Sequence, residues 1–436
     1  MKIGIVGLGF VGLSFASVLA SRGYSVIGVD SNERKVSSIN GGIMPFYEPR
    51  LDIVLKKALK KDLTITTEIS LAVNTCNFIF VTVGTPQSNT GLIDLSMVKS
   101  AIIKIGKLLT KTKNEPLIII KSTVIPRTTD NVILPLLEKK SGKKVGKNFG
   151  LITNPEFLRE GKAIDDTLKP HVVVLGGNND KFMNRLVKFY TSFHPNVPII
   201  KTNFQTAEMI KYANNSFLAT KISFINQIAT ICETIPGTNV ENVAKTIGLD
   251  PRIGNLFLNA GPGYGGSCLP KDIKAIINFS SKQGIKPILL DAVEQINRNQ
   301  VKNIILRIKK LIGKINGKTI TILGLAFKSD TDDIRDSVSI KLIKELQKKG
   351  AKIKVHDPKA IDNTKSIFRN KIQYEYSIKN ALKDSYCGII MTPWEQYSRI
   401  TKNDIKSMKT KVIIDTRRML NDQKLGINYY AIGVGR

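Results

Sequence analysis

Residues 2–30 read KIGIVGLGFVGLSFASVLASRGYSVIGVD, and this stretch decides the fold. The apolar run at 2–6 predicts a buried strand, the pattern at 11–21 predicts a helix, and 25–30 predicts a second strand. A strand, a helix and a strand within thirty residues are typical of a βαβ unit in a parallel sheet. The chain therefore begins with an α/β domain of the doubly wound type.

A glycine loop stands between the first strand and the helix. Gly7, Gly9 and Gly12 have the spacing GxGxxG, which allows a tight turn and a close approach of the backbone to a pyrophosphate. Phe10 and Val11 begin the helix, where free N–H groups bind phosphate oxygens. Because the motif follows a strand and begins a helix, it predicts a dinucleotide site, and a chance match is the less favoured interpretation.

The end of the second strand predicts which dinucleotide binds. Asp30 follows Gly12 by 18 residues, and its carboxylate suits two ribose hydroxyls but repels a 2′-phosphate. The next residue is Ser31 and not an arginine, so the sequence favours NAD over NADP. We also expect Lys35, in the following turn, to contact the cofactor.

The pattern of a strand, a glycine turn, a helix and a strand occurs a second time. Residues 319–323 predict a strand followed by Gly324, and residues 352–356 predict another that ends at Asp357. Only one fingerprint glycine remains there, which favours a nucleotide-diphosphate site or a structural domain over a second dinucleotide site. Between the two α/β parts, residues 205–234 have helical apolar spacing and contain no proline or glycine.

We therefore expect two Rossmann-like, doubly wound domains joined by a long central helix and a helical middle domain. The expected boundaries are 1–200 for the NAD-binding domain, 201–312 for the middle domain and 313–436 for the carboxy-terminal domain. Further strands of the first sheet are expected at 78–83, 117–121 and 172–175.

Composition limits the other classes of function. The 436 residues carry a formal net charge of +31, but the lysines are spread along the whole length without a nucleic-acid-binding motif. A non-enzymatic binder of nucleic acid is thus the less favoured alternative. No run of 18 apolar residues is present, so we expect a cytoplasmic protein without a membrane span. The four cysteines and three histidines are far apart and predict no metal site.

Candidate catalytic residues lie in the stretch Gly261–Asp272, GPGYGGSCLPKD. Its glycines allow a ligand close to the backbone, and Pro270 suits the first position of a helix. Cys268 then lies just before the helix, where the helix dipole and Lys271 favour a thiolate. Asp272 is close enough to act as an acid or a base. The other three cysteines lack such surroundings, and we interpret them as core residues.

Within this stretch, Gly265–Asp272 closely resembles the nucleophile motif of the UDP-glucose and GDP-mannose dehydrogenase family. The resemblance covers nearly the whole chain, because further motifs occur in order. They are Gly7–Gly12, Val83-Gly84-Thr85-Pro86, Ser122-Thr123-Val124, Asn154-Pro155-Glu156-Phe157-Leu158, Ala207-Glu208 with Lys211, and Gly324–Asp336.

The resemblance implies a four-electron oxidation of the C6 hydroxyl of a sugar nucleotide to a carboxylate, with two NAD consumed. It assigns Cys268 as the nucleophile that forms a thiohemiacetal and then a thioester. Lys211 resembles the lysine that stabilises the oxyanion and Asn215 its partner. Thr123 and Asp272 match the residues that order and activate a water, and Glu156 matches a carboxylate that assists proton movement.

The resemblance also implies that residues 313–436 form a UDP-sugar-binding domain, and it implies the binding residues. Expected cofactor contacts beyond the glycine loop, Asp30 and Lys35 are Thr85, Thr123, Glu160, Lys271 and Arg335. Expected substrate contacts are Phe157, Leu158, Glu160, Lys211, Asn215, Arg252, Phe257, Tyr264, Gly265, Phe327, Lys328 and Arg417. The acidic cluster of Asp330, Asp332, Asp333 and Asp336 is interpreted as capping and ion pairing.

The substrate is predicted from the branch that the motifs resemble. Ser267 stands where dehydrogenases of N-acetylated sugars often have histidine, and Asp250–Ala260 is similar to the UDP-glucose branch. One family lysine is replaced by Asn259, and other stretches are GDP-mannose-like. We expect UDP-glucose to be oxidised to UDP-glucuronate, with GDP-mannose or a UDP-N-acetylhexosamine as alternatives.

In this branch Arg252 reaches a neighbouring subunit, which implies a homodimer or larger homo-oligomer. A two-electron hydroxy-acid dehydrogenase is the alternative chemistry on the same fold.

Overall fold

A computed structural model describes residues 1–88, 91–112, 114–420 and 425–435. The chain separates into two compact units, Met1–Asn214 and Asn215–Arg436. Each unit holds one sheet, so the prediction of two Rossmann-like α/β parts is confirmed. The three-part division at 200/201 and 312/313 stays a prediction.

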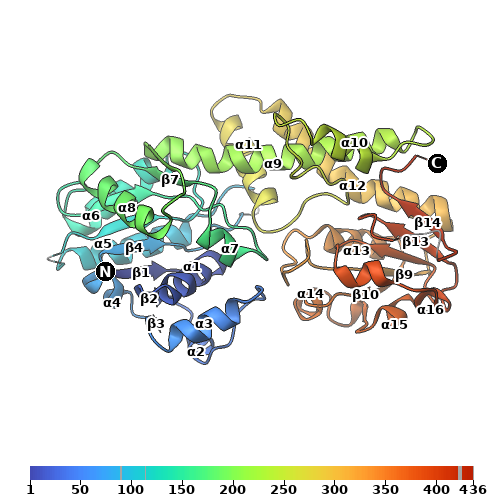
Figure 1. Ribbon diagram of the computed structural model, residues 1–436, viewed down its shortest axis with the longest axis horizontal. Helices are drawn as coiled ribbons and strands as arrows, with labels where there is room; N and C mark the ends of the chain where they lie inside the picture. The colour runs from blue at the N-terminus through green and yellow to red at the C-terminus, as the bar shows by residue number, and fades with distance from the viewer. Residues whose placement is uncertain (89–90, 113, 421–424, 436) are drawn as a thin grey trace. The chain divides into compact units, whose positions relative to one another are not determined.

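The first unit is built on an eight-stranded sheet with the order β3-β2-β1-β4-β5-β6-β7-β8 (Figure 1). Its first six strands have the order 3-2-1-4-5-6 that is typical of dinucleotide-binding folds. All neighbouring pairs are parallel except β6 with β7. The strands are β1 (Lys2–Val6), β2 (Ser25–Val29), β3 (Leu63–Thr66), β4 (Phe78–Val81), β5 (Leu117–Ile120), β6 (Gly150–Thr153), β7 (Val173–Gly176) and β8 (Ile199–Thr202).

Apolar residues on both faces of its strands explain why this sheet is covered on both sides. In β4, Phe78 and Phe80 belong to one hydrophobic core, whereas Ile79 and Val81 belong to another. Such continuous apolar strands are expected where helices cover both faces of a parallel sheet. The helices are α1 (Phe10–Ser21), α2 (Glu33–Asn40), α3 (Leu51–Leu59), α4 (Ile69–Thr75), α5 (Ser96–Leu109), the π-helical turn η1 (Thr129–Ile133), α6 (Leu134–Ser141), α7 (Ala163–Leu168) and α8 (Asp180–Phe193).

The second unit holds a six-stranded, fully parallel sheet with the order β11-β10-β9-β12-β13-β14. This is again the order 3-2-1-4-5-6, so the two sheets share one topology. The strands are β9 (Thr319–Leu323), β10 (Lys352–His356), β11 (Gln373–Tyr374), β12 (Cys387–Ile390), β13 (Val412–Asp415) and β14 (Asn428–Ala431).

Helices precede and cover this second sheet. The long helix α9 (Phe204–Cys232) begins in the first unit and ends in the second, and it confirms the helix predicted at 205–234. No helix among the described residues is long and apolar enough to cross a membrane. The other helices are α10 (Val240–Ile247), α11 (Leu269–Lys282), α12 (Ile288–Ile312), α13 (Val338–Lys348), α14 (Ile361–Phe368), η2 (Arg369–Lys371), α15 (Ile378–Leu382), η3 (Glu395–Arg399) and α16 (Lys402–Ile405).

Candidate active site

The glycine loop has the geometry that a bound pyrophosphate requires. Gly7 has a φ of +103°, and a Cβ there would lie 2.7 Å from the backbone nitrogen of Val83. A Cβ on Gly12 would lie 1.9 Å from the carbonyl oxygen of Gly7, so neither position accepts a side chain. A Cβ on Gly9 would meet no atom within 4 Å. The first unit thus keeps open space above the start of α1 (Phe10–Ser21), where the helix N-terminus attracts phosphate.

Asp30 lies at the carboxyl end of β2, next to this loop. Its Oδ2 accepts a hydrogen bond from the Leu8 N–H at 3.0 Å and lies 2.7 Å from Nζ of Lys35. The carboxylate is therefore fixed to the glycine loop while Lys35 partly neutralises its charge. This is the place where a ribose is bound in dinucleotide folds, and the residues fit NAD.

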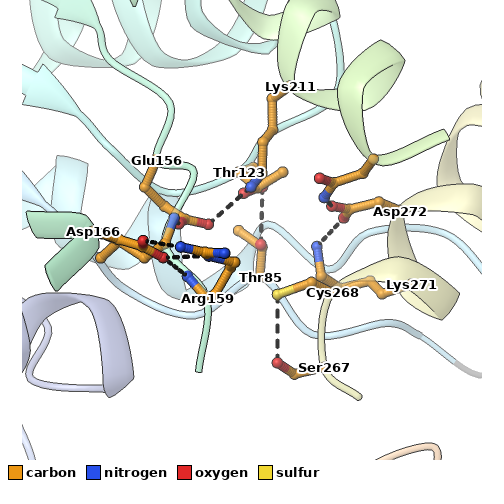
Figure 2. A network of polar contacts seen from close by, with 12 residues as sticks. Thr85, Thr123, Glu156, Arg159, Asp166, Lys211, Ser267, Cys268, Lys271 and Asp272 are labelled. Carbon is orange, nitrogen blue, oxygen red and sulfur yellow. Dashed lines mark hydrogen bonds and ion pairs between the residues drawn. The ribbon is translucent and has the colours of Figure 1, made fainter. Parts of the chain in front are cut away.

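A buried ion pair lies at the same edge of the sheet. Nζ of Lys211, on α9, lies 3.0 Å from Oε1 of Glu156, in the loop after β6, and both side chains are almost fully buried. Figure 2 shows the Lys211 side chain pointing toward this carboxylate. The lysine also lies over the ring of Phe157, 5.3 Å from its centroid. The N–H of Leu158 donates to the other Glu156 oxygen at 2.5 Å. Two oppositely charged groups are thus positioned together within the first unit.

Other predicted residues of this unit lie on neighbouring loops. The hydroxyl of Thr85 donates to the carbonyl oxygen of Thr123 at 2.9 Å, which joins two of the predicted positions (Figure 2). Glu160 is buried near the start of α7 (Ala163–Leu168). Both loops leave carboxyl ends of parallel strands, where α/β sheets bind their ligands.

One buried cation of this site was missed by sequence reasoning. Lys121 ends the apolar run of β5, and its Nζ donates to Oδ1 of Asn154 at 3.1 Å. The same oxygen accepts from the Tyr190 hydroxyl at 2.5 Å, and the Asn154 amide donates to the Val174 carbonyl oxygen at 2.9 Å. Burial lowers the pKa of Lys121 to about 8, although the Glu156 carboxylate opposes this shift. A lysine in an apolar strand directly before Ser122-Thr123-Val124 is the signal that could have identified it.

In the second unit, Cys268 is the residue directly before α11 (Leu269–Lys282), as predicted. Pro270 is the second helical residue and not the first, and its missing N–H costs nothing because early helical N–H groups have no partner within the helix. Cys268 is partly exposed, and its Sγ lies 3.5 Å from the hydroxyl of Ser267. Cys76, Cys232 and Cys387 are buried, in agreement with their interpretation as core residues.

Asp272 lies one turn after the cysteine, and its carboxylate accepts hydrogen bonds from two side chains. Asn215, on α9, donates to its Oδ2 at 2.7 Å, and Nζ of Lys271 lies 2.5 Å from its Oδ1. The Lys271 ammonium therefore points to the carboxylate of Asp272 (Figure 2). Its charge is shared with Asp272, so the helix N-terminus is the more direct stabilisation of a thiolate at Cys268.

The glycines before the cysteine permit close packing within the second unit. A Cβ on Gly265 would lie 2.7 Å from the Asp336 carbonyl oxygen, and one on Gly266 would lie 2.7 Å from the ring of Phe327. The N–H of Gly266 donates to the Arg335 carbonyl oxygen at 3.0 Å. The predicted substrate residues Gly265 and Phe327 are thus brought together.

Three predicted ligand contacts lie around this loop. Arg417 is buried, and burial lowers its pKa to about 10. A Cβ on Gly261 would lie 2.9 Å from the Arg417 guanidinium, so a side chain at this position would displace the arginine. Lys328 lies beside the ring of Phe327, at 5.8 Å from its centroid. Arg335 pairs with Asp333 at 2.6 Å, which agrees with the interpretation of the acidic cluster as ion pairing.

Tyr264 is held by a second helix of the same unit, and sequence reasoning missed this support. Its N–H donates to Oδ1 of Asn297 at 2.8 Å, and its carbonyl oxygen accepts from the Asn297 amide at 3.0 Å. The Tyr264 hydroxyl donates to Glu294 at 3.4 Å. Both partners lie on α12 (Ile288–Ile312), so this helix fixes the backbone that leads to Cys268.

Arg252 and Phe257 are not part of this cluster among the described contacts. Arg252 is exposed and forms a bidentate pair with Asp250 at 2.6 Å. Phe257 is partly exposed and has a φ of +65°, an uncommon backbone conformation for a bulky residue. The predicted reach of Arg252 to a neighbouring subunit and the predicted substrate contacts of both residues stay predictions.

The second unit repeats the glycine turn and the acidic residue of the first unit, but the acidic residue has different partners. Gly324 has a φ of +99°, close to the +103° of Gly7, and Asp357 directly follows β10 as Asp30 directly follows β2. Asp357, however, accepts the N–H groups of Leu325 and Ala326 at 2.7 and 3.1 Å. Its two oxygens also accept from the N–H groups of Lys359 and Ala360 and from the Trp394 indole. The absence of a second dinucleotide site stays a prediction.

Family models match three consecutive parts of the chain. Residues 1–194 match the NAD binding domain of the UDP-glucose/GDP-mannose dehydrogenase family, residues 205–299 its central domain, and residues 321–422 its UDP binding domain. The chain belongs to this family. It is an NAD-dependent oxidoreductase, and the expected cofactor is confirmed.

Relatives over the full length support the family assignment. The UDP-glucose 6-dehydrogenase TuaD of Bacillus subtilis is 39% identical, with 99% of this chain and 93% of the relative covered. The UDP-glucose 6-dehydrogenase AglM of Haloferax volcanii is 38% identical over 99% of this chain and 100% of the relative. A solved UDP-glucose dehydrogenase from Pyrobaculum islandicum has a TM-score of 0.93 and 31% identity, with 99% and 98% of the two chains covered. A UDP-D-ManNAc dehydrogenase from Pyrococcus horikoshii has a TM-score of 0.86 and 28% identity, with 99% of each chain covered.

Proposed function

We propose that this family member oxidises UDP-glucose to UDP-glucuronate in two successive oxidations, with Cys268 as the covalent nucleophile. The observation that carries the proposal is the position of Cys268 directly before α11, partly exposed, on a glycine-rich loop. Burial raises the pKa of the Cys76 and Cys387 thiols, which disfavours their thiolates. Cys268 is the cysteine whose position suits nucleophilic attack.

The chemistry balances as two oxidations followed by one hydrolysis. NAD, which the glycine loop and Asp30 would hold, would supply the acceptor for one hydride in each oxidation. The alcohol is first oxidised to an aldehyde, and the thiolate of Cys268 then adds to the aldehyde carbon. The addition forms a C–S bond and a thiohemiacetal, whose oxidation gives a thioester. Water breaks the C–S bond, which releases the carboxylate and returns the thiol. Covalent capture prevents escape of the aldehyde between the two oxidations.

Charged residues of the chain support these steps. We assign Lys211 to stabilise the negative oxygen that develops during oxidation and thiol addition, because its ammonium is held by Glu156 in a buried setting. Asn215 donates to Asp272, which lies one turn after the cysteine, and this pair is suited to orienting a water or moving a proton. Glu156 and Thr123 complete the set proposed for thioester hydrolysis.

Substrate choice is proposed from the relatives and from one residue. The UDP-glucose dehydrogenases named above are full-length relatives of higher identity than the UDP-D-ManNAc dehydrogenase. Ser267, and not histidine, precedes the cysteine. GDP-mannose and UDP-N-acetylhexosamines are the alternatives for the same mechanism.

NADH formation with a panel of sugar nucleotides tests the proposal. Two NADH for each UDP-glucose consumed are expected, with UDP-glucuronate as product. One NADH for each substrate would instead favour the two-electron alternative, and activity with GDP-mannose alone would move the substrate. Cys268→Ser is expected to abolish carboxylate formation while NAD binding, measured by titration, stays within about twofold, because the cysteine lies outside the glycine loop. Full uronate output from Cys268→Ser would overturn the covalent mechanism.

We also propose that the protein works as a homodimer or larger homo-oligomer. Phe217, Phe224 and Ile231 follow one another at seven-residue spacing on α9, and each is roughly half exposed or more. Large apolar side chains aligned on one helix face are typical of an interface between subunits. The exposed Arg252 is then available to a neighbouring copy.

A further inference from the structure

A groove in the second unit is lined by α11, α12 and α13 and has a volume of about 980 Å³. Eight of its seventeen lining residues are lysine or arginine, whereas two are acidic. Glu294 lies 3.8 Å from Arg298, and Glu345 lies 2.7 Å from Lys348, so both carboxylates are already paired with groove cations. We call this feature the α12–α13 groove; it carries a strong excess of positive charge.

The cations are arranged in two rows on the helices that form the walls. Arg298, Lys302 and Lys309 lie on α12 at spacings of four and seven, and Lys341, Lys344 and Lys348 lie on α13 at spacings of three and four. Residues so spaced share one helix face. Lys302, Lys309 and Lys344 have no acidic partner within 4 Å among the described residues. Like charges in such rows destabilise the unliganded helices, and a bound anion removes this cost.

The groove has the size and composition of a ligand site and differs from a flat basic patch. Its volume is near the upper end of the range for small-molecule pockets. Buried Val301, Ile305 and Val338 form an apolar floor between the basic rows. An extended nucleic acid would need a continuous basic surface, whereas a concave site suits a compact ligand with several negative groups.

The wall of the groove is also the support of the nucleophile loop. Glu294 and Asn297 line the groove, and both bind Tyr264 in the loop that leads to Cys268. Pro270 and Lys274 come from α11, the helix that begins after that cysteine. An anion that pairs with Arg298 would compete with Glu294, which accepts from the Tyr264 hydroxyl.

We propose that the α12–α13 groove binds a small anion with several linked phosphate groups, and that its occupancy alters the nucleophile loop through Glu294 and Asn297. The binding site stands on its own residues, whereas the effect on turnover rests on the proposed function. Linked phosphates fit because several charges must be met at once along two facing rows of ammonium groups. A nucleoside triphosphate and an inorganic polyphosphate share this chemistry.

Calorimetric titration of the full chain with inorganic tripolyphosphate, and separately with ATP, tests the site. Saturating NAD and UDP are present so that both nucleotide sites are filled. We expect one tripolyphosphate for each chain, with an affinity that falls steeply with added salt. Equal affinity for ATP indicates that the phosphates alone are recognised, and tighter binding of ATP indicates that the apolar floor also contacts the base. The absence of binding by either probe would overturn the proposal.

Charge-reversal variants separate the groove from the general basicity of the chain. Lys302→Glu with Lys344→Glu changes two groove residues, and Lys57→Glu with Lys60→Glu makes the same change in net charge on exposed residues of α3 and its end. We expect the groove variant to lose about tenfold or more in affinity and the control to stay within about twofold. Equal losses in both would show that only net charge matters and would overturn the site.

Two further measurements keep the outcome clear. If the charge-reversed variant unfolds, Lys302→Gln with Lys344→Gln is used instead, with an expected loss of about threefold or more in affinity for tripolyphosphate.

Tripolyphosphate is then added to the NADH assay at saturating substrate. A change in kcat that the groove variant abolishes supports transmission to the loop, whereas binding without any change in kcat overturns the transmission and leaves the site. Should the chain not oxidise UDP-glucose, the calorimetric result still decides whether the groove binds phosphates.

Discussion

Nζ of Lys211 lies 3.0 Å from Oε1 of Glu156, and both groups are shielded from water. Removal of water makes each charge depend on the other, because an isolated charge in such a place is costly. The pair therefore holds the lysine side chain oriented before a substrate arrives. The same contact has consequences for stability and for catalysis that can be measured separately.

Lys211→Met is expected to destabilise the protein by about 3 kcal/mol, because it leaves the Glu156 carboxylate buried without its cation. Lys211→Met with Glu156→Gln should recover most of that loss, while the turnover of both variants stays at least about a hundredfold below wild type because the cation is missing. Urea unfolding and NADH formation measure the two effects. A double variant as unstable as the single one would show that the pair is not the origin of the loss.

Asp30→Asn is expected to raise the KM for NAD and to increase the preference for NADP relative to NAD by about tenfold. The amide keeps an acceptor for the Leu8 N–H, but it no longer repels a 2′-phosphate, and Lys35 is released from its 2.7 Å ion pair. Steady-state kinetics with both cofactors give the ratio. An unchanged ratio would contradict the assignment of Asp30 to the ribose. Glu33→Gln, on the exposed start of α2, is the control and should change neither constant.

Lys121→Met tests the buried network at Asn154. The pKa of Lys121 is about 8 in the folded protein, below its ordinary 10.5, so between these values the unfolded chain holds a proton that the folded protein has lost. Wild-type stability should therefore rise with pH relative to the variant across this window, by about 3 kcal/mol in total. Unfolding free energies at pH 7.5, 9 and 10.5 measure this difference. A constant difference would show that Lys121 is not the titrating group.

Asn297→Ala should lower kcat by about tenfold and leave the KM for NAD nearly unchanged, because it removes two hydrogen bonds to the Tyr264 backbone in the second unit. Asn303→Ala, an exposed residue on the same helix, is the matched control. Equal activity of the two variants would show that the loop holds its conformation without Asn297.

Phe224→Glu should shift the protein toward monomers if the exposed row on α9 is the subunit interface, because a charge replaces an apolar contact. Light scattering after size-exclusion chromatography measures the mass. Ile53→Glu, on the exposed face of α3, provides the comparison and should leave the mass unchanged. Loss of assembly in both variants would point to a general effect of charge.

The sequence predicted the parts of the fold whose signals are local. The strand at Lys2–Val6, the tight turn at Gly7 and the place of Cys268 before a helix all follow from patterns within a few residues. The missing parts depend on partners far apart in the chain. Asn297 lies 33 residues from Tyr264, and Asn154 lies 33 residues from Lys121. No local spacing indicates such pairs.

The partner that a charged side chain of the site contacts could also not be predicted from local spacing. The spacing placed Lys271 near Cys268, but its ammonium lies on Asp272. A long lysine side chain can reach several neighbours, and the choice depends on which carboxylate the fold brings within about 3 Å. The family resemblance indicates which residues form the site, whereas the structure shows which contacts they make.

Asp357 has a consequence for the order of events in each reaction cycle. Its carboxylate is occupied by the N–H groups of Leu325, Ala326, Lys359 and Ala360 and by the Trp394 indole, so the second unit has no free acceptor for a ribose at this position. On the proposed function, each chain would then hold a single dinucleotide at a time. A reaction that consumes two must release the first reduced cofactor and admit another while the half-oxidised sugar stays attached. In the proposed reaction the loading stoichiometry is one and the consumption stoichiometry is two, and the covalent bond to Cys268 would keep the sugar in place between the two loadings.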